Sequence, residues 1–280
     1  MVNVAIAGGT GGVGRTILEV LQATSQHQAF VLSRQASQHL PNTITMNYDD
    51  TDRIADILER KNIHTTKRFV PSGYAIPYPQ RALEFLPQLN DYFEAIYELR
   101  RSGLEWTVFH NGIFLDYFGT PALTSYLKPN VFVIDMEHKV AAIPGDGNTP
   151  VTFTYTFDLA RFIVASLDLE KWDEESRVIG DEKTFNEFVA LAEEARGSKF
   201  QVFYDDVEKL QRSEITELPG HKALYKQIPK ESFQWFTSIF ERFTADGTSH
   251  IARAGSLNER FPDIKPLSVK NMLDRYWKNA

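Results

Sequence analysis

The chain begins with a short apolar stretch that runs directly into a cluster of glycines. Residues 2–7 (VNVAIA) are followed by GGTGGVGR, and apolar residues then recur at helical spacing from Val13 to Leu21. A strand that ends in glycines and continues as a helix is typical of the first βα turn of a dinucleotide-binding fold. The alternative is a turn that shapes the backbone without holding a phosphate. The strand–turn–helix context favours a bound cofactor.

The glycines of this turn have different expected tasks. Gly9 and Gly11 let the backbone turn tightly and approach a pyrophosphate, and Gly14 lets the new helix pack closely on the sheet. Free N–H groups at the helix N-terminus then attract the phosphates. The predicted cofactor-binding residues of the turn are Gly8, Gly9, Thr10, Gly11, Gly12, Val13 and Gly14.

The end of the second predicted strand indicates which dinucleotide is bound. Residues 29–32 lead into Ser33 and Arg34, and no acidic residue lies between Glu19 and Asp49. NAD-selective proteins place a carboxylate here to bind the ribose 2′-hydroxyl, whereas an arginine suits the 2′-phosphate of NADP. We therefore predict that Arg34 binds this phosphate, that Ser33 is an additional donor, and that the cofactor is NADP(H). The alternative for Arg34 is a solvated surface side chain.

The third predicted strand, residues 43–46, is followed by the acidic pair Asp49 and Asp50. A carboxylate at this place can accept a hydrogen bond from the adenine amino group. The pair can equally cap the next predicted helix, residues 52–60, because acidic side chains are common at helix N-termini. Both interpretations stay open at this point.

Composition argues against several other classes of function. The chain has 280 residues, a net charge of −7 and no cysteine. The negative charge, without a basic run, argues against nucleic acid or an anionic membrane as a partner. The lack of thiols excludes disulfides and cysteine-based metal sites, and the seven histidines form no metal-binding pattern, so no metal is expected. We find no signal peptide or membrane span and expect a cytoplasmic protein.

Several segments resemble one known group of proteins. The opening GGTGGVGR, the strand ending SR and the segment KRFVPSG at 67–73 resemble the NmrA-like and isoflavone-reductase-like proteins, which are atypical short-chain dehydrogenases. SGLEWTV at 102–108 is similar to the same group, and NGIFLDYF at 111–118 to its fungal members. The resemblance implies an α/β fold, a Rossmann-like doubly wound parallel sheet with a small C-terminal α+β substrate lobe. We place the NADP-binding Rossmann domain at residues 1–150, and the late Rossmann elements and substrate lobe at 151–280.

One strand-and-helix unit of this pattern is missing near residues 64–67. A doubly wound sheet needs a fourth strand and a crossover helix after residues 52–60, but the RFVPS segment already begins at Arg68. Parallel neighbours need a crossover of about 10–12 residues or more, usually a helix. In the strand order 3-2-1-4-5-6 the missing strand lies beside the first one, against the cofactor.

Three explanations of the missing unit compete. The gene model or transcript lost an exon, the RFVPS strand moves into the vacant position, or the fold is compromised. We favour the first as the origin and the second as the folded outcome. An empty central position would leave two rows of backbone groups unpaired, so we do not expect it in a folded state.

The sequence contains no standard proton donor for hydride transfer. Classical short-chain dehydrogenases pair a tyrosine with a lysine four residues later, which lowers the pKa of the tyrosine. None of the 11 tyrosines here has a lysine at that spacing. The resemblance to isoflavone-reductase-like enzymes implies a lysine on the helix before SGLEWT, near Tyr92, but no lysine lies between Lys67 and Lys128.

Tyr74 is the best remaining candidate for a catalytic residue. It directly follows the RFVPSG segment, and ligands bind outside the carboxyl ends of parallel strands. Its alternative role is packing or a turn, because nothing in the sequence would lower its pKa. Tyr92, His110 and Asn111 are further candidates, although a single histidine at a strand end is more often structural.

Two functions follow from these features. The first is an NADP(H)-binding NmrA-like oxidoreductase that acts on a small, aromatic or enone-bearing metabolite by hydride transfer. The second is a non-catalytic NADP-binding regulator that senses the redox ratio and works through a protein partner. The absent lysine favours the regulator. The aromatic residues beyond Tyr204 favour the enzyme if they line a substrate pocket rather than the lobe core. A non-functional product of a truncated transcript is a third possibility.

Overall fold

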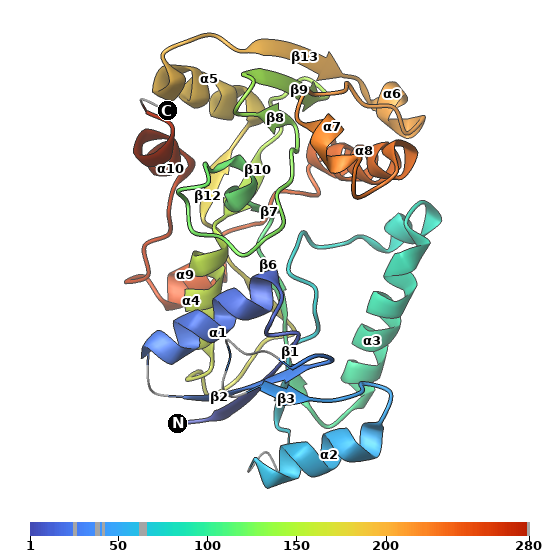
Figure 1. Cartoon of the computed structure of the whole chain (residues 1–280), viewed down its shortest axis with the longest axis vertical. Helices are drawn as coiled ribbons and strands as arrows, with labels where there is room; N and C mark the ends of the chain where they lie inside the picture. Colours follow the sequence, from blue (N-terminus) through green and yellow to red (C-terminus); the bar gives the residue numbers. More distant parts are fainter. Residues whose placement is uncertain (25–26, 37–39, 41–42, 62–65, 279–280) are drawn as a thin grey trace.

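The computed structural model of the protein describes residues 1–24, 27–36, 40, 43–61 and 66–278. Parallel strands with covering helices form the N-terminal half, and shorter strands with further helices form the rest (Figure 1). The predicted α/β class is confirmed. In the described part of the chain, no helix combines the length and apolar character needed to cross a bilayer.

The first strands form a parallel sheet in the order β1-β2-β3. The elements are β1 (Asn3–Ala7), α1 (Gly12–Thr24), β2 (Gln28–Ser33), β3 (Thr43–Thr45) and α2 (Thr51–Arg60). Ile17 and Leu21 of α1 are buried in a core that also contains residues of β1, β2 and α4 (Thr156–Ser166). The sequence predicted these first elements closely, because each has a clear apolar period.

The next strands form separate short pairings. The elements are β4 (Arg68–Phe69), η1 (Gln80–Glu84), η2 (Pro87–Leu89), α3 (Asn90–Arg101), β5 (Glu105–Trp106), β6 (Val108–His110) and β11 (Glu175–Arg177). β4 runs parallel to β5, and β6 runs parallel to β11. α3 packs through Ile96 and Leu99 on Trp106 and Val108.

The sheet is interrupted where the sequence lacks a strand-and-helix unit. Within the described residues, β1 pairs only with β2, and β4 pairs only with β5. The expectation that the RFVPS strand moves beside β1 is therefore wrong. Residues 62–65, in the region of the missing unit, lie outside the described residues.

Arg68 explains why β4 stays beside β5. Its guanidinium donates a hydrogen bond to Glu105 Oε2 at 2.5 Å. It also donates to three carbonyl oxygens after α4, those of Leu167 (3.1 Å), Leu169 (2.7 Å) and Glu170 (2.8 Å). Moving the strand to β1 would break all four of these charge-assisted bonds, which are stronger than neutral ones.

The gap changes the burial of two elements. Val4 and Ala5 of β1 are only half-buried, whereas strands of a parallel sheet are normally covered on both faces. α2 is amphipathic, yet none of its residues is buried. Its apolar Ile54, Ile57 and Leu58 stay partly in contact with water.

The C-terminal part is built on two further sheets, one in the order β13-β9-β8 and one in the order β12-β10-β7. Its largest core cluster includes Phe118, Phe153, Phe185 and Phe188, whose rings contact one another. The elements are β7 (Ile113–Phe114), η3 (Leu115–Phe118), β8 (Ile134–Asp135), β9 (Val140–Pro144), β10 (Val151–Thr154), β12 (Asp181–Lys183), α5 (Phe185–Arg196), β13 (Gln201–Asp205), α6 (Val207–Gln211), α7 (His221–Leu224), α8 (Lys230–Ala245), α9 (Leu257–Arg260) and α10 (Val269–Tyr276).

β11 ends at Arg177, one residue before the buried pair Val178 and Ile179. The backbone N–H and C=O of Ile179 bond to the side-chain amide of Asn258, at 2.9 and 2.8 Å. The division of the chain at residue 150 stays a prediction. β10 and β11, which follow it, pair back with β7 and β6.

Replacing Arg68 with alanine should destabilise the N-terminal half. The change removes the four hydrogen bonds and leaves Glu105 without its partner, so we expect the free energy of unfolding to fall by about 2–4 kcal/mol. Urea denaturation followed by circular dichroism measures this. The matched control is Arg100→Ala, which removes an exposed ion pair with Glu174 and should cost at most about 1 kcal/mol. Equal losses in the two variants would contradict the anchoring role.

Candidate functional site

The backbone of the turn between β1 and α1 is packed so tightly at Gly14 that a side chain would not fit there. Gly8 has a φ of 72°, in the left-handed region that favours glycine. The amide of Gly11 donates to the carbonyl oxygen of Gly8 at 2.9 Å. A Cβ at Gly14 would lie 2.6 Å from the same oxygen. The start of α1 is therefore held directly on the turn.

Gly9 and Gly12 have packing tasks that the sequence did not reveal. A Cβ at Gly9 would lie 2.9 Å from a methyl carbon of Val31 on β2. A Cβ at Gly12 would lie 2.9 Å from Leu127 Cδ2 and 3.0 Å from the carbonyl oxygen of Tyr126. Gly9 was expected to keep the backbone clear for a pyrophosphate, but its hydrogen faces the sheet.

The turn is open to solvent along most of its length. Gly8, Thr10 and Gly11 are exposed, and Val13 is half-buried against the core. The first turn of α1 contains no acidic residue. Free N–H groups and the positive end of the helix dipole are therefore accessible to an anion.

Tyr48 ties this turn to the end of β2. Its hydroxyl donates to the carbonyl oxygen of Leu32 at 2.7 Å and accepts from the amide of Gly8 at 3.2 Å. The same amide also donates to Leu32 at 3.0 Å. Sequence analysis missed this role, because a single tyrosine after a strand has no signal that identifies its partner.

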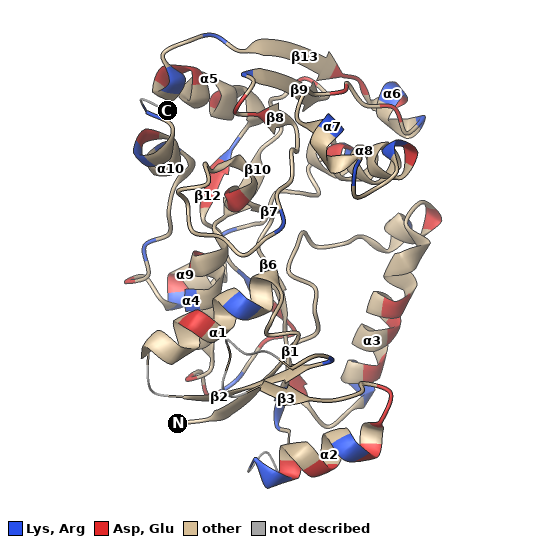
Figure 2. Ribbon diagram, in the orientation of Figure 1, with Lys and Arg blue, Asp and Glu red and all other residues tan. Residues whose placement is uncertain are grey.

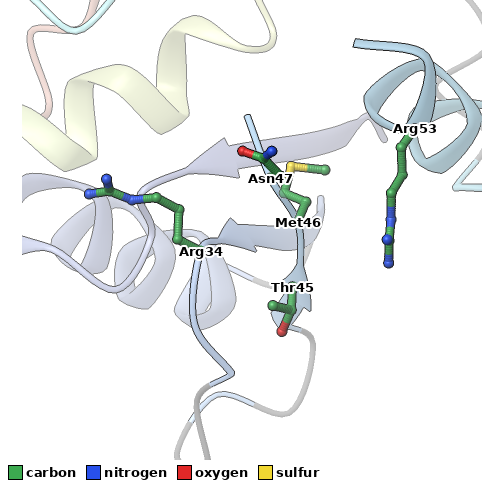
Figure 3. A pocket seen from close by; sticks show the side chains of 5 residues that line it. All are labelled: Arg34, Thr45, Met46, Asn47 and Arg53. Atoms are coloured by element: carbon green, nitrogen blue, oxygen red, sulfur yellow. The ribbon is translucent and has the colours of Figure 1, made fainter. Parts of the chain in front are cut away.

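A hollow of about 410 Å³ lies beside the ends of β2 and β3. It is lined by Arg34, Thr45, Met46, Asn47 and Arg53 (Figure 3). Figure 3 shows the side chains of Arg34 and Arg53 on opposite sides of the segment 45–47. Both arginines are exposed, and neither forms an ion pair with another described residue. Two unpaired cations around one hollow make it suited to an anion.

Other residues predicted for the adenosine end have structural bonds. Ser33 is buried, and its Oγ accepts a hydrogen bond from the amide of Gln35 at 3.2 Å. Asp50 Oδ1 accepts from the amide of Arg53 at 3.0 Å and caps α2. The helix-cap interpretation of the acidic pair is thus confirmed for Asp50. Arg53 was not predicted, although its position in the first turn of a helix after β3 could have indicated it.

Tyr74 lies near the glycine turn but in an apolar setting. It packs against the same core cluster as Val13 and Tyr117, and its ring centre lies 6.3 Å from that of Phe109. Burial raises the pKa of Tyr74 to about 12. A phenol of this kind stays protonated and can donate a hydrogen bond to a carbonyl oxygen, but no neighbouring cation helps it to release its proton.

Tyr78 and Tyr92 form a second group of phenols beside Tyr74. Their ring centres are 5.7 Å apart, edge to face, and a Cβ at Gly73 would lie 2.9 Å from the ring of Tyr92. The pKa of Tyr78 is raised to about 12 by burial and by the nearby phenols of Tyr92 and Tyr117. Burial also raises the pKa of Tyr92, which has no lysine near it in sequence.

His110 and Asn111 are enclosed at the end of β6. Their exposed fractions are 4% and 0%. His110 Nδ1 and Asn111 Oδ1 have no hydrogen-bond partner among the described residues. Burial lowers the pKa of His110, so its ring is neutral. Both side chains offer polar atoms, but neither is open to a substrate in this conformation.

Aromatic residues of α8 reach the N-terminal half. Phe240 and Phe243 lie with their ring centres 6.4 Å from that of Tyr78. The cluster also includes Ile76 and Leu86 from the connection between β4 and α3. These aromatics pack as a core between distant segments, which is the second of the two roles considered for them. No group of three or more potential metal ligands occurs among the described residues.

Comparison with known sequences identifies fungal relatives. Oxidoreductase BOA1 of Botryotinia fuckeliana is 32% identical over 300 residues, covering 95% of this chain and 96% of the relative. Oxidoreductase swnN of Metarhizium robertsii is 30% identical over 339 residues, covering 99% and 98%. No protein-family model matches the sequence.

The alignment with the Botryotinia protein also measures what this chain lacks. It spans 300 residues, whereas 95% of the 280-residue chain is about 266 residues, so about 34 residues of the relative have no counterpart here. A βαβ unit takes about 30 residues or more.

The fold matches solved reductases. A ternary complex of leucoanthocyanidin reductase from Vitis vinifera superposes with a TM-score of 0.69 at 16% identity, covering 98% of each chain. AtPrR2 with NADP⁺ and (+)pinoresinol gives 0.70 at 18% identity, and a crystal structure of isoflavone reductase gives 0.68 at 15% identity, each covering 98% of both chains. At these identities the likeness concerns the fold. The relatives that are at least 30% identical over nearly the whole chain show that the protein belongs to the family of these fungal oxidoreductases, and its fold is that of isoflavone reductase and its neighbours.

Proposed function

We propose that this protein is an NADP(H)-dependent oxidoreductase that acts on a small carbonyl or enone metabolite. The observation that carries the proposal is an open glycine turn at α1 together with an exposed arginine after β2 that has no ion-pair partner among the described residues. Relatives named oxidoreductases support the reaction class. Neighbouring structures described with NADPH or NADP⁺ support the cofactor.

Separate groups of residues suit the pyrophosphate and the 2′-phosphate of NADP(H). The Gly11 amide is already bonded to the carbonyl oxygen of Gly8. The amides that follow it begin α1, whose first turn contains no acidic residue, so they suit the pyrophosphate. Arg34 is exposed beside a hollow and suits the 2′-phosphate. Tyr48 fixes the distance between these two places through its bonds to Gly8 and Leu32.

The reacting end requires a hydrogen-bond donor for the substrate oxygen. The nicotinamide, when bound, supplies or accepts the hydride. In our proposal the phenol of Tyr74 holds the carbonyl oxygen and carries the proton that this oxygen needs. Its pKa of about 12 makes it a weak acid at neutral pH, so we expect slow turnover.

A non-catalytic regulator is the second candidate. It is favoured by the absence of any lysine between Lys67 and Lys128 and by the raised pKa of Tyr74. Such a protein would bind NADPH and NADP⁺ with different affinities and pass the difference to a protein partner. A cytoplasmic location stays a prediction for both candidates.

Replacing Arg34 with aspartate should reverse the cofactor preference. The carboxylate repels the 2′-phosphate and can accept from a ribose 2′-hydroxyl, so we expect NADP⁺ affinity to fall about tenfold to a hundredfold while NAD⁺ affinity holds or rises. Calorimetric titration measures both. The charge-matched control is Arg60→Asp, which makes the same change of charge in the last turn of α2. An unchanged NADP⁺ affinity in Arg34→Asp would refute the assignment.

Replacing Tyr74 with phenylalanine should separate binding from chemistry. Loss of the donor should lower kcat about a hundredfold or more, and NADPH affinity should stay the same. NADPH oxidation against a panel of carbonyl and enone compounds gives kcat, and fluorescence titration gives the affinity. Tyr97→Phe, on the exposed side of α3, is the control. Wild-type protein that binds NADPH and NADP⁺ unequally but turns over nothing would support the regulator.

Filling the interrupted sheet should strengthen both fold and site. A strand-and-helix segment from a fungal relative, inserted between Lys61 and Lys67, would give β1 a second neighbouring strand and cover α2. We expect a higher melting temperature and tighter NADP⁺ binding. A glycine–serine insert of equal length is the control and should stabilise nothing, because it only lengthens a loop. The same melting temperature for both inserts would show that the position beside β1 does not accept the unit.

A further inference from the structure

Arg53 brings a second positive charge to the hollow beside Arg34. It stands in the first turn of α2, a helix on which charges of both signs follow one another (Figure 2). The two arginines stand on different elements, one after β2 and one on α2, with segment 45–47 between them (Figure 3), and both line the hollow. In a chain of net charge −7, two arginines without an ion-pair partner among the described residues form a local positive site.

The backbone holds the two arginines in a fixed relation. The amide of Met46 donates to the carbonyl oxygen of Ser33 at 2.9 Å, which joins the end of β3 to the residue before Arg34. The side chain of Met46 is buried and forms the base of the hollow. Asp50 Oδ1 then fixes the amide of Arg53 at 3.0 Å. Both arginine side chains are exposed, so each can turn toward a ligand bound in the hollow.

α2 has few apolar contacts with the rest of the protein. None of its residues is buried, and Ile54, Ile57 and Leu58 are only partly covered. A helix with so few apolar contacts opens at low cost in free energy. A ligand that bonds to Arg53 on α2 and to Arg34 after β2 at once would join the helix to the sheet.

We propose that Arg53 is a second ligand of the 2′-phosphate of NADP(H), and that the bound cofactor thereby fastens α2 to the sheet. The inference rests on the proposed function, because it assumes that the hollow takes the adenosine end of NADP(H). It adds Arg53 as a residue that determines the preference for NADP(H), and it adds that cofactor binding stabilises α2. NADP⁺, unlike NAD⁺, should protect the helix.

The test compares four proteins, wild type, Arg34→Ala, Arg53→Ala and Arg60→Ala, with NADP⁺ and NAD⁺ as ligands. Arg60 is exposed on the same helix and pairs only with Asp56, at 4.0 Å, among the described residues, so it controls for loss of charge on α2. We expect Arg53→Ala to bind NADP⁺ about tenfold more weakly with NAD⁺ binding unchanged, since one charge-assisted contact is lost. Arg60→Ala should bind both as the wild type does.

Hydrogen exchange of residues 51–60 provides a readout that does not depend on activity. NADP⁺ should slow exchange in the wild type and in Arg60→Ala, but not in Arg53→Ala, and NAD⁺ should slow it in none. Equal weakening of NAD⁺ and NADP⁺ by Arg53→Ala would mean that Arg53 contacts the adenine ring or shapes the helix, and would overturn the inference. Wild-type NADP⁺ affinity in Arg53→Ala, with preference lost in Arg34→Ala, would overturn it and leave the proposed function intact. A wild type that binds neither ligand would overturn both.

Discussion

The close approach of Gly14 to the carbonyl oxygen of Gly8 positions the start of α1 on the glycine turn. With 2.6 Å between that oxygen and the place of a Cβ, α1 can begin there only if residue 14 is glycine. The position of α1 sets the direction of its N-terminal amides and places Gly12 against Tyr126 and Leu127. The bonds of Tyr48 to Gly8 and Leu32 transmit the same constraint to the end of β2. The open turn and the arginine-lined hollow thus belong to one connected piece of structure.

The interrupted sheet is the main departure from the family pattern. Among the described residues β1 pairs with β2 but with no strand on its other side, and α2 has no buried residue. The missing unit itself stays a prediction. The fold accommodates the loss because each side has its own support. β1 keeps β2 and α1, and β4 keeps β5 and the bonds of Arg68. The vacancy weakens the packing near the cofactor without removing the turn or the hollow.

The residues proposed for proton transfer fit their role less well than the residues proposed for cofactor binding. Tyr74 and Tyr78 have pKa values raised to about 12 because burial disfavours the phenolate. No lysine replaces the one implied by the family resemblance, and Tyr92 occupies its neighbourhood. Both candidate functions require the glycine turn and Arg34 for cofactor binding. Only the enzyme also requires a proton donor such as Tyr74.

The sequence alone determined the first βα turn, the cation after β2 and the fold class, since each depends on local spacing or on residue type. The tertiary structure decided that β4 stays beside β5, because the partners of Arg68 lie about a hundred residues away in the chain. It also decided that Arg53 faces the same hollow as Arg34, that Tyr48 bridges the turn and that Gly9 serves packing on Val31. Contacts between residues distant in sequence leave no periodic or spacing signal, so only the folded chain brings them together.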